Sequence, residues 1–501
     1  MDLLLNNLAV GFSGAATLEN VGYAFIGCLL GTLVGVLPGI GVVPTVAMLL
    51  PLTFGIDPLS GLIMLAGIYY GAQYGGSTAA ILVRMPGEAG SIVTTLDGYE
   101  MARKNRGGAA LAIAALASFF AGTVATLLIA AFGSSLADVA MHFHSADYFS
   151  LMVLGLTMSI VLAQGSILKA ITVMLIGFLF GLIGLDLNSG VQRFTFDMPD
   201  LYEGVSFLAI SIGLFGLVEV VRNLEFPEVC GEKPTMGIRD LYPTKEELRD
   251  AAPATVRGTV LGSMLGILPG GGAVLASFAS YTLEKKLSKK PETFGHGAPA
   301  GVAAPEAANN AGAQTSFIPL LTLGLPSNPI MALLMGAMMI HGVAPGSAII
   351  SERPELFWGL IASMWIGNLM LVVLNLPLVG LWVKLLTISY RMLFPAIMMF
   401  CLIGVYSEGG SAFQVLLLGG FTLFGYLLMR CGCEPAPLIL GFILGPMMEE
   451  NLRRALNVSG GDYSIFIDRP ISASLLGAAV VLLVVMSLPG LRKKRAKVFE
   501  D

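Results

Sequence analysis

Two copies of one motif rich in glycine and proline are the residues of this sequence best suited to bind a ligand. Residues 31–41 read GTLVGVLPGIG and residues 262–272 read GSMLGILPGGG, so both fit G-x3-G-x2-P-G-x-G at an offset of 231. A Pro-Gly pair inside an apolar helix removes a backbone donor and frees a carbonyl one turn earlier. In a membrane such groups need protein or a water-filled cavity around them, so paired helix breaks predict a binding site near the midplane. The residues assigned to it are Pro38, Gly39, Gly41, Pro269, Gly270 and Gly272.

The first two glycines of each motif have a second interpretation. Gly31 and Gly35, like Gly262 and Gly266, have the four-residue spacing that lets two helix backbones approach closely. We favour helix packing for these four glycines and a functional break for the Pro-Gly-x-Gly segments that follow them.

A second correspondence, after each motif, predicts a helical hairpin in each half of the chain. Gly71-Ala72-Gln73 matches Gly312-Ala313-Gln314, and Met85-Pro86-Gly87-Glu88 matches Leu325-Pro326-Ser327-Asn328. Arms of about 13 residues lead to tips that contain proline, and second arms follow. Each arm is shorter than the roughly 20 residues that span a bilayer, so re-entrant loops are expected. The expected arms are 72–84 and 89–102 in the first hairpin, and 313–325 and 329–342 in the second.

The hairpin tips are expected to bind an anion. Backbone N–H groups at the start of each second arm present the positive end of a helix dipole, which suits a carboxylate. Carbonyls at the arm ends could instead hold Na⁺, so a sodium site at the helix breaks is an alternative. Arg84 and Glu88 either contact the substrate and ion or extend to a nearby aqueous face. The side chains and tip residues assigned to binding are Gln73, Pro86, Gly87, Glu88, Ser91, Thr94, Pro326, Ser327 and Asn328.

Residues 303–314 (AAPEAANNAGAQ) form an unusually polar run between apolar segments. Asn309, Asn310 and Gln314 in this run could line the binding site or could satisfy a helix end. We favour the site.

The composition determines the kind of element that positions these residues. Charged residues make up 12% of the 501 positions, hydrophobic residues 55%, and the mean hydropathy is +0.81. A soluble protein of this size carries about 25% charged residues, so an ordinary soluble enzyme, a disordered chain and a nucleic-acid-binding protein are excluded. The apolar stretches are too long for β-barrel strands. The sequence predicts an all-α polytopic membrane protein with roughly 10 to 12 transmembrane helices.

Motifs of common enzymes are absent from the sequence. It contains no HExxH, GxxxxGK[ST] or GxSxG segment, so we expect neither an enzyme nor an ATPase. No basic region precedes the first apolar residues, and a cleaved signal peptide is not expected. The five scattered cysteines do not suggest a disulfide framework.

The duplicated motifs divide the chain into two related halves. The expected segments are a first transmembrane repeat at 20–222, a polar linker at 223–254, a second repeat at 255–450 and a C-terminal extension at 451–501. The extension holds the last transmembrane helix and a basic tail at 492–497, which should be cytoplasmic.

The distribution of lysines suggests how the two halves are oriented. At an offset of 231, residues 54–61 correspond to residues 285–292, which contain four lysines where the first loop has no basic residue. Loops on opposite faces of the membrane would explain this contrast, so the repeats are expected to be inverted. A parallel duplication remains the alternative.

These motifs resemble the large membrane subunit, the TctA type, of the tripartite tricarboxylate transporters. The resemblance runs through Gly31–Gly41, Tyr74-Gly75-Gly76-Ser77-Thr78 and Met85–Glu88 with Leu96-Asp97-Gly98-Tyr99. It continues in Pro305-Glu306-Ala307-Ala308-Asn309-Asn310, in 445–454 (GPMMEENLRR) and in Arg469-Pro470. Together these segments cover nearly the whole chain.

The resemblance implies a secondary transporter of the bacterial inner membrane that imports citrate-like tricarboxylates or related carboxylates. It implies a small membrane partner of the TctB type and a periplasmic solute-binding protein of the TctC type, with Na⁺ or H⁺ as the coupling ion and no other cofactor. Alternating access around the two tips and the two helix breaks is the expected mechanism. The alternative is a stand-alone, ion-coupled organic-anion symporter.

Overall fold

Helices account for nearly all of the described chain in the computed structural model. The described residues are 2–37, 40–140, 142–162, 166–186, 189–225, 238–268, 272–385 and 390–487. Within these ranges two short antiparallel strands, β1 (Gly184–Leu185) and β2 (Gln192–Arg193), form the sheet. The predicted all-α class is confirmed.

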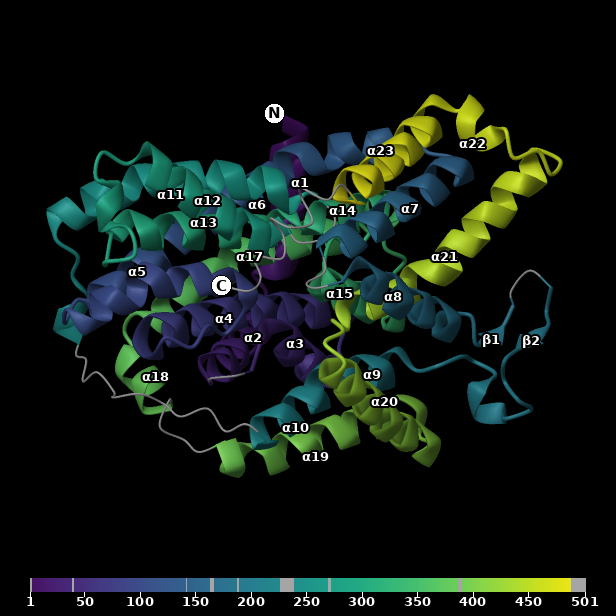
Figure 1. Cartoon of the computed structure of the whole chain (residues 1–501), viewed down its shortest axis with the longest axis horizontal. Helices are drawn as coiled ribbons and strands as arrows, with labels where there is room; N and C mark the ends of the chain where they lie inside the picture. Colours follow the sequence, from purple (N-terminus) through teal and green to yellow (C-terminus); the bar gives the residue numbers. More distant parts are fainter. Residues whose placement is uncertain are drawn as a thin grey trace.

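The largest group of helices contains the duplicated motifs and lies across the left and centre of Figure 1. Its first half pairs α2 with α4, and its second half pairs α11 with α13. Its elements are α1 (Asp2–Ala15), α2 (Leu18–Val36), α3 (Val42–Leu49), η1 (Leu50–Thr53), α4 (Pro58–Val83), η2 (Ala89–Ser91), α5 (Ile92–Arg103), α6 (Gly107–Ala140), η5 (Ile238–Leu241), α11 (Lys245–Gly266), α12 (Gly272–Leu287), η6 (Pro291–Thr293), α13 (Pro299–Thr315), α14 (Phe317–Leu323), α15 (Pro329–Ile340), α16 (Ala348–Glu352), α17 (Pro354–Asn375) and α18 (Val379–Leu385).

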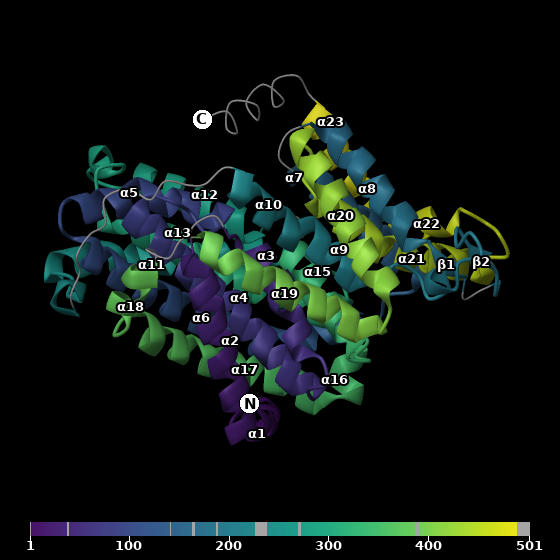
Figure 2. The ribbon, with the colours of Figure 1, turned by 90° about the horizontal axis from the view of Figure 1, so that it is seen from below.

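Two smaller groups of helices pack beside it, as Figure 2 shows from below. In one of them α7 and α8 pack on α21, and α23 packs on α7. That group consists of α7 (Ser145–Leu162), α8 (Ile167–Gly181), α21 (Ala436–Val458), α22 (Ile465–Asp468) and α23 (Pro470–Ser487), with the β-hairpin at its edge. The other consists of η3 (Pro199–Leu201), α9 (Phe207–Ser211), the π-helical segment η4 (Ile212–Leu217), α10 (Val218–Glu225), α19 (Tyr390–Gly409) and α20 (Ala412–Arg430).

Five helical stretches of the described residues are long and apolar enough to cross a membrane. They are α2, residues 107–133 of α6, the continuous segment 207–225, α17 and α20. Six further apolar stretches have 10 to 17 described residues, and three of them belong to longer helices, α7 with 18 residues, α19 with 20 and α23 with 18.

The two hairpins differ from the expected pair of short arms. The arm expected at 72–84 is the end of α4, which runs unbroken for 26 residues and is about 39 Å long. Its counterpart is divided at Ser316 into α13 and α14. The predicted short first arm is therefore wrong for the first hairpin. The second arms, α5 and α15, have 12 residues each and are too short to span a bilayer.

The paired glycines lie where two helix backbones touch. A Cβ atom added to Gly31 of α2 would lie 2.3 Å from the carbonyl oxygen of Ile68 in α4. A Cβ atom added to Gly262 of α11 would lie 2.3 Å from the carbonyl oxygen of Ala308 in α13. Gly35 and Gly266 repeat this contact one turn later, against Ala72 and Gly312. The packing interpretation of these four glycines is confirmed.

Replacing Gly31 with alanine should destabilise the protein by about 1–3 kcal/mol, because the added methyl group must push α2 away from α4. Gly22 on the same helix is the matched control, since no atom in the described part of the chain lies within 4 Å of a Cβ built there. We expect Gly31→Ala to lower the thermal midpoint of the purified protein in detergent and Gly22→Ala to leave it unchanged or higher. Equal midpoints for the two variants would contradict the packing assignment.

The turns that precede α4 and α13 correct the alignment of the two halves. Both read P-x-T-F-G, from Pro51 to Gly55 and from Pro291 to Gly295, and both end on a glycine with positive φ, +74° and +86°. Pro291 follows Pro51 by 240 residues, whereas the offset at the preceding motif is 231. The two offsets differ by nine residues. The comparison of 54–61 with 285–292 is therefore wrong by nine residues. Helix α12 has 16 residues and its counterpart α3 has eight, so the four lysines lie in an insertion of the second half. The contrast between the two loops therefore does not test their orientation, and the inverted orientation of the repeats stays a prediction.

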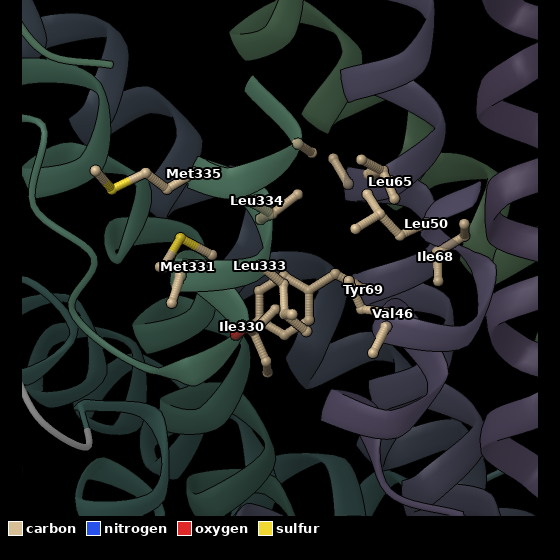
Figure 3. Packing of buried hydrophobic residues seen from close by; sticks show 14 of the residues in the cluster. Val46, Leu50, Leu65, Ile68, Tyr69, Ile330, Met331, Leu333, Leu334 and Met335 are labelled. Carbon is tan, nitrogen blue, oxygen red and sulfur yellow. The ribbon is translucent and has the colours of Figure 1, made fainter. Parts of the chain in front are cut away.

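The apolar core joins the first half to the second hairpin. Figure 3 shows the Tyr69 ring of α4 beside Ile330 and Leu333 of α15, with Val46 of α3 on its other side. Tyr69 is 1% exposed, so it has lost nearly all of its contact with solvent. This core holds the second arm α15 against α4 and α3.

Ion pairs join several of the helices to one another and to the β-hairpin. Helix α11 begins at Lys245, inside the range expected for the linker, and the Glu247 carboxylate accepts a 3.0 Å hydrogen bond from Arg106. In the 445–454 motif, Glu449 pairs with Arg453 at 2.6 Å and with Arg193 of the β-hairpin at 2.9 Å. Residues 226–237 of the linker and the basic tail at 492–497 lie outside the described residues.

Candidate functional site

One face of α13 carries the polar side chains of the buried interior. Glu306, Asn309, Asn310 and Gln314 are spaced three, four and eight residues from the first of them, so they share one side of the helix. All four are at most 4% exposed. Of the two interpretations of residues 303–314, a satisfied helix end does not describe Asn309 and Asn310, which lie inside α13 and bond to Glu88 and to Ser118 of α6. Gln314 lies in the last turn of α13, and both interpretations stay open for it.

Glu306 is bonded to the first half of the chain. Its carboxylate accepts a hydrogen bond of 2.8 Å from Ser77 of α4 and one of 2.6 Å from Thr94 of α5. Among the ion pairs formed by described residues, none includes Glu306. The two hydroxyl groups therefore offset part of the cost of burying the Glu306 carboxylate, which has no basic partner among the described residues.

Glu88, at the tip of the first hairpin, points into the protein. It accepts a hydrogen bond from the side-chain amide of Asn309, which ties the tip to α13. The Gln73 amide lies close to Glu88, yet both of its polar atoms lack a hydrogen-bond partner among the described residues. Arg84, in contrast, is exposed, and its guanidinium lies 5.7 Å from the centre of the Tyr99 ring. The half-buried Glu88 is thus joined to the buried polar side chains of α13, and the exposed Arg84 lies apart from them.

The same tip meets the broken helix of the first half. A Cβ atom on Gly87 would lie 2.3 Å from Cα of Gly76 in α4, and one on Gly41 would lie 3.5 Å from the carbonyl oxygen of Gly87. The backbone of the tip therefore lies between α4 and the start of α3. Pro86 is exposed at its edge, whereas Ser91 is buried and donates its hydroxyl to the Glu88 carbonyl at 3.0 Å. Pro38 and Gly39 lie outside the described residues.

The second tip is bonded to its own half. Asn328 caps α15 by accepting a 2.9 Å hydrogen bond from the Met331 N–H, and its amide donates to the Ser316 hydroxyl at 3.3 Å. Ser327 donates to the Ser316 carbonyl at 3.4 Å, and Pro326 between the arms is buried. The roles of these three residues in substrate binding stay predictions.

The second helix break lies beside this tip. Gly272 packs against Gly266, and Gly266 in turn lies against α13 at Gly312. Gln314 on α13 is buried, and its side-chain oxygen has no hydrogen-bond partner in the described ranges. Pro269 and Gly270 lie outside those ranges. The structure therefore brings Gly41, Gln73, Gly87, Glu88, Ser91 and Asn309 together at the first tip, where Pro86 is exposed. Thr94 and Asn310 instead bond to Glu306 and Ser118. Ser327 and Asn328 bond to Ser316, and Gly272 lies beside them against Gly266.

Asp97 of α5 joins the two halves and was not predicted as a functional residue. Its Oδ1 accepts backbone hydrogen bonds of 2.9, 2.8 and 2.7 Å from Gly295, Gly297 and Ala298, and its Oδ2 accepts one of 2.9 Å from the Tyr281 hydroxyl. The three backbone donors lie in the loop just before α13, and Tyr281 lies in α12. Asp97 thus holds the loop that leads into α13 from the other half, whereas α4 is capped by its own neighbour Asp57.

The arrangement is typical of one class of membrane protein. Broken helices and short hairpins that enclose buried carboxylates at the centre of a helical, multi-pass chain are features of secondary transporters.

The comparisons with known proteins identify the family. The model of the tripartite tricarboxylate transporter TctA family matches residues 21–440, and the chain belongs to this family. It is therefore a multi-pass membrane protein of a transporter family rather than an enzyme.

Two relatives come from Agrobacterium vitis. An uncharacterized 52.8 kDa protein in the TAR-I ttuC' 3' region is 57% identical over 99% of each chain. An uncharacterized protein in the TAR-II ttuC' 3' region is 61% identical over 48% of this chain and 99% of its own length. No solved structure matches the chain.

Proposed function

We propose that this protein is the large transmembrane subunit of an ion-driven importer of tricarboxylates or related carboxylates in the bacterial inner membrane. A periplasmic solute-binding protein delivers the substrate, and a small membrane subunit completes the complex. The match to the TctA family over residues 21–440 carries this proposal. The arrangement of the first hairpin tip supports it.

The tip of the first hairpin can contact an anion through its backbone. The chain turns at Gly87 beside Gly41 and continues through η2 into α5, so the N–H groups of the first turn of α5 are oriented toward the tip. Such groups stabilise a carboxylate without a buried arginine or lysine. The amide of Gln73, whose polar atoms are not hydrogen bonded to other described residues, adds a neutral donor.

The buried carboxylates give a physical reason for coupling to an ion gradient. A substrate carboxylate beside Glu88 meets a like charge at a place where few water molecules can screen it. Binding there becomes favourable when a cation or a proton enters with the substrate. In this mechanism one group of helices moves against the other, and the loaded site opens to each side of the membrane in turn.

An uptake assay in cells tests the function and the position of the tip together. We expect accumulation of radiolabelled citrate or another carboxylate only when the chain is expressed with its binding protein and its small subunit. Gly87→Val should abolish uptake, because its side chain would overlap Gly76 and displace the tip from α4. Gly22→Val is the matched control, because no described atom lies within 4 Å of a Cβ built at Gly22 of α2, and it should retain uptake.

Two results of this assay would contradict the proposal. Normal uptake by Gly87→Val, with protein in the membrane at the wild-type level, would exclude the tip from the site. Uptake by the chain alone in proteoliposomes would favour the stand-alone symporter instead.

A further inference from the structure

A small cavity with both polar and apolar residues in its wall lies beside Glu306, and the hairpin tip residues Glu88 and Gly87 do not line it. It has a volume of about 20 Å³, which is sufficient for one water molecule or one ion of similar size. Helices α4, α6, α13 and α17 each contribute a polar side chain to its wall. Those residues are Tyr74, Ser77, Thr78, Ser118, Glu306 and Asn375.

Asn375 provides an acceptor that is not used by the protein. Its amide nitrogen donates to the Leu371 carbonyl at 2.9 Å, and its side-chain oxygen has no hydrogen-bond partner among the residues that the structure describes. The residue is 7% exposed. A buried acceptor without a donor costs about 1–3 kcal/mol, so an occupant of the cavity that binds oxygen atoms would be stabilised there.

The other polar atoms of the cavity wall are also oxygen atoms with free lone pairs. Thr78 donates its hydroxyl to the Tyr74 carbonyl at 3.1 Å, which leaves the hydroxyl oxygen able to accept. Ser118 accepts a 2.7 Å hydrogen bond from the amide of Asn310 and retains a second lone pair. Oxygen ligands of this kind suit a hard cation rather than an anion.

Charge favours a monovalent cation. Glu306 is the acidic residue of the cavity wall, and none of the ion pairs in the described ranges includes it. One cation of charge +1 would neutralise this carboxylate, whereas a divalent ion would leave a net buried charge. Sites for Ca²⁺ usually contain several carboxylates and six to eight oxygen atoms, more than this wall offers.

We propose that the cavity binds one Na⁺ ion, held by Glu306, Asn375, Ser77 and Thr78. The role of this ion in coupling rests on the proposed transport function, whereas the binding of Na⁺ to the cavity does not. The second oxygen of Glu306 accepts from Thr94 of α5, the helix that starts at the tip with Glu88. An ion bound to one oxygen of the Glu306 carboxylate therefore helps to hold α5 in place through the other oxygen. Substrate and ion would then bind cooperatively.

Direct binding of ²²Na⁺ to the purified full-length chain in detergent, in potassium buffer and without substrate, tests the site. We expect saturable binding of one ion per chain, weakened at least tenfold by Glu306→Gln, Asn375→Leu and Thr78→Val. Asn375→Asp keeps an oxygen atom at the site and should keep binding. Ser363→Ala is the control, because Ser363 is a buried residue of α17 that does not line the cavity.

The outcomes are distinguishable. The nearly isosteric Thr78→Val variant keeps the test meaningful if a polar replacement fails to fold, and monodisperse elution of each variant shows that it is folded. The absence of saturable Na⁺ binding in the wild type would overturn the proposal, as would wild-type binding by both Asn375→Leu and Thr78→Val. Saturable binding in a chain that transports no carboxylate with its partners would leave the sodium site standing and overturn the proposed function alone.

Discussion

Asp97→Ala should be among the most destabilising single replacements in this protein, with a loss of about 3 kcal/mol or more. Three backbone N–H groups before α13 and the Tyr281 hydroxyl lose their shared acceptor, and Asp97 is fully buried, so water cannot easily replace it. Because α13 carries Glu306 and Asn309, loosening its start should also weaken transport. Thermal unfolding of the purified protein in detergent should show a midpoint lowered by about 5 °C or more.

The aspartate at the equivalent helix provides a matched control. Asp57 caps α4 through one hydrogen bond of 3.0 Å at an exposed position, so Asp57→Ala should cost only about 1 kcal/mol. Asp97→Asn keeps an acceptor oxygen without the charge and should lie between the two. A midpoint for Asp97→Ala within error of that for Asp57→Ala would show that the bonds across the two halves do not stabilise α13.

The sequence predicts the paired architecture well because close helix packing leaves a signal in residue size. Gly31 and Gly262 are glycines because a neighbouring carbonyl occupies the space of any side chain. The same repeat predicts the two second arms, α5 and α15, with nearly the observed bounds. Composition predicts the helical membrane class because 12% charged residues cannot cover a soluble surface.

The loops between the motifs could not be aligned from the motifs alone. The nine-residue insertion falls where α12 extends beyond the length of α3, and helix length depends on contacts that no local pattern records. The shared P-x-T-F-G turn would have revealed the correct offset. The contact that holds the loop before α13 has no local signal at all, because its acceptor Asp97 is about 200 residues away in the sequence.

The candidate site was predicted in part for a similar reason. Asn309 and Gln73 were assigned from their polar character within apolar segments, and both are buried and lie close to Glu88. Glu306 was noted only within a family motif, although an acidic residue inside an apolar helix is a functional candidate by itself. Asn375 stands at the end of an ordinary apolar helix, and only the folded chain places it against the cavity.

Replacing Asn309 with alanine should lower the initial rate of carboxylate uptake by about 30- to 100-fold. The Glu88 carboxylate would lose the amide donor that ties the first tip to α13, and a hydrogen bond to a charged buried group is worth about 2–3 kcal/mol. Asn309 also packs against Gly90, so the position of the tip depends on the same side chain. Uptake by cells that express all three components measures the effect.

Asn368→Ala separates this role from general destabilisation. Asn309 and Asn368 are each 1% exposed, so both replacements remove a buried amide of the same size, but Asn368 packs on Gly122 of α6 and not on the tip. We expect Asn368→Ala to retain most of the uptake at equal protein levels. Combining Asn309→Ala with Glu88→Gln should cost much less than the product of the two single effects, because both act on one bond. Fully multiplicative losses would show that Asn309 acts through some contact other than Glu88.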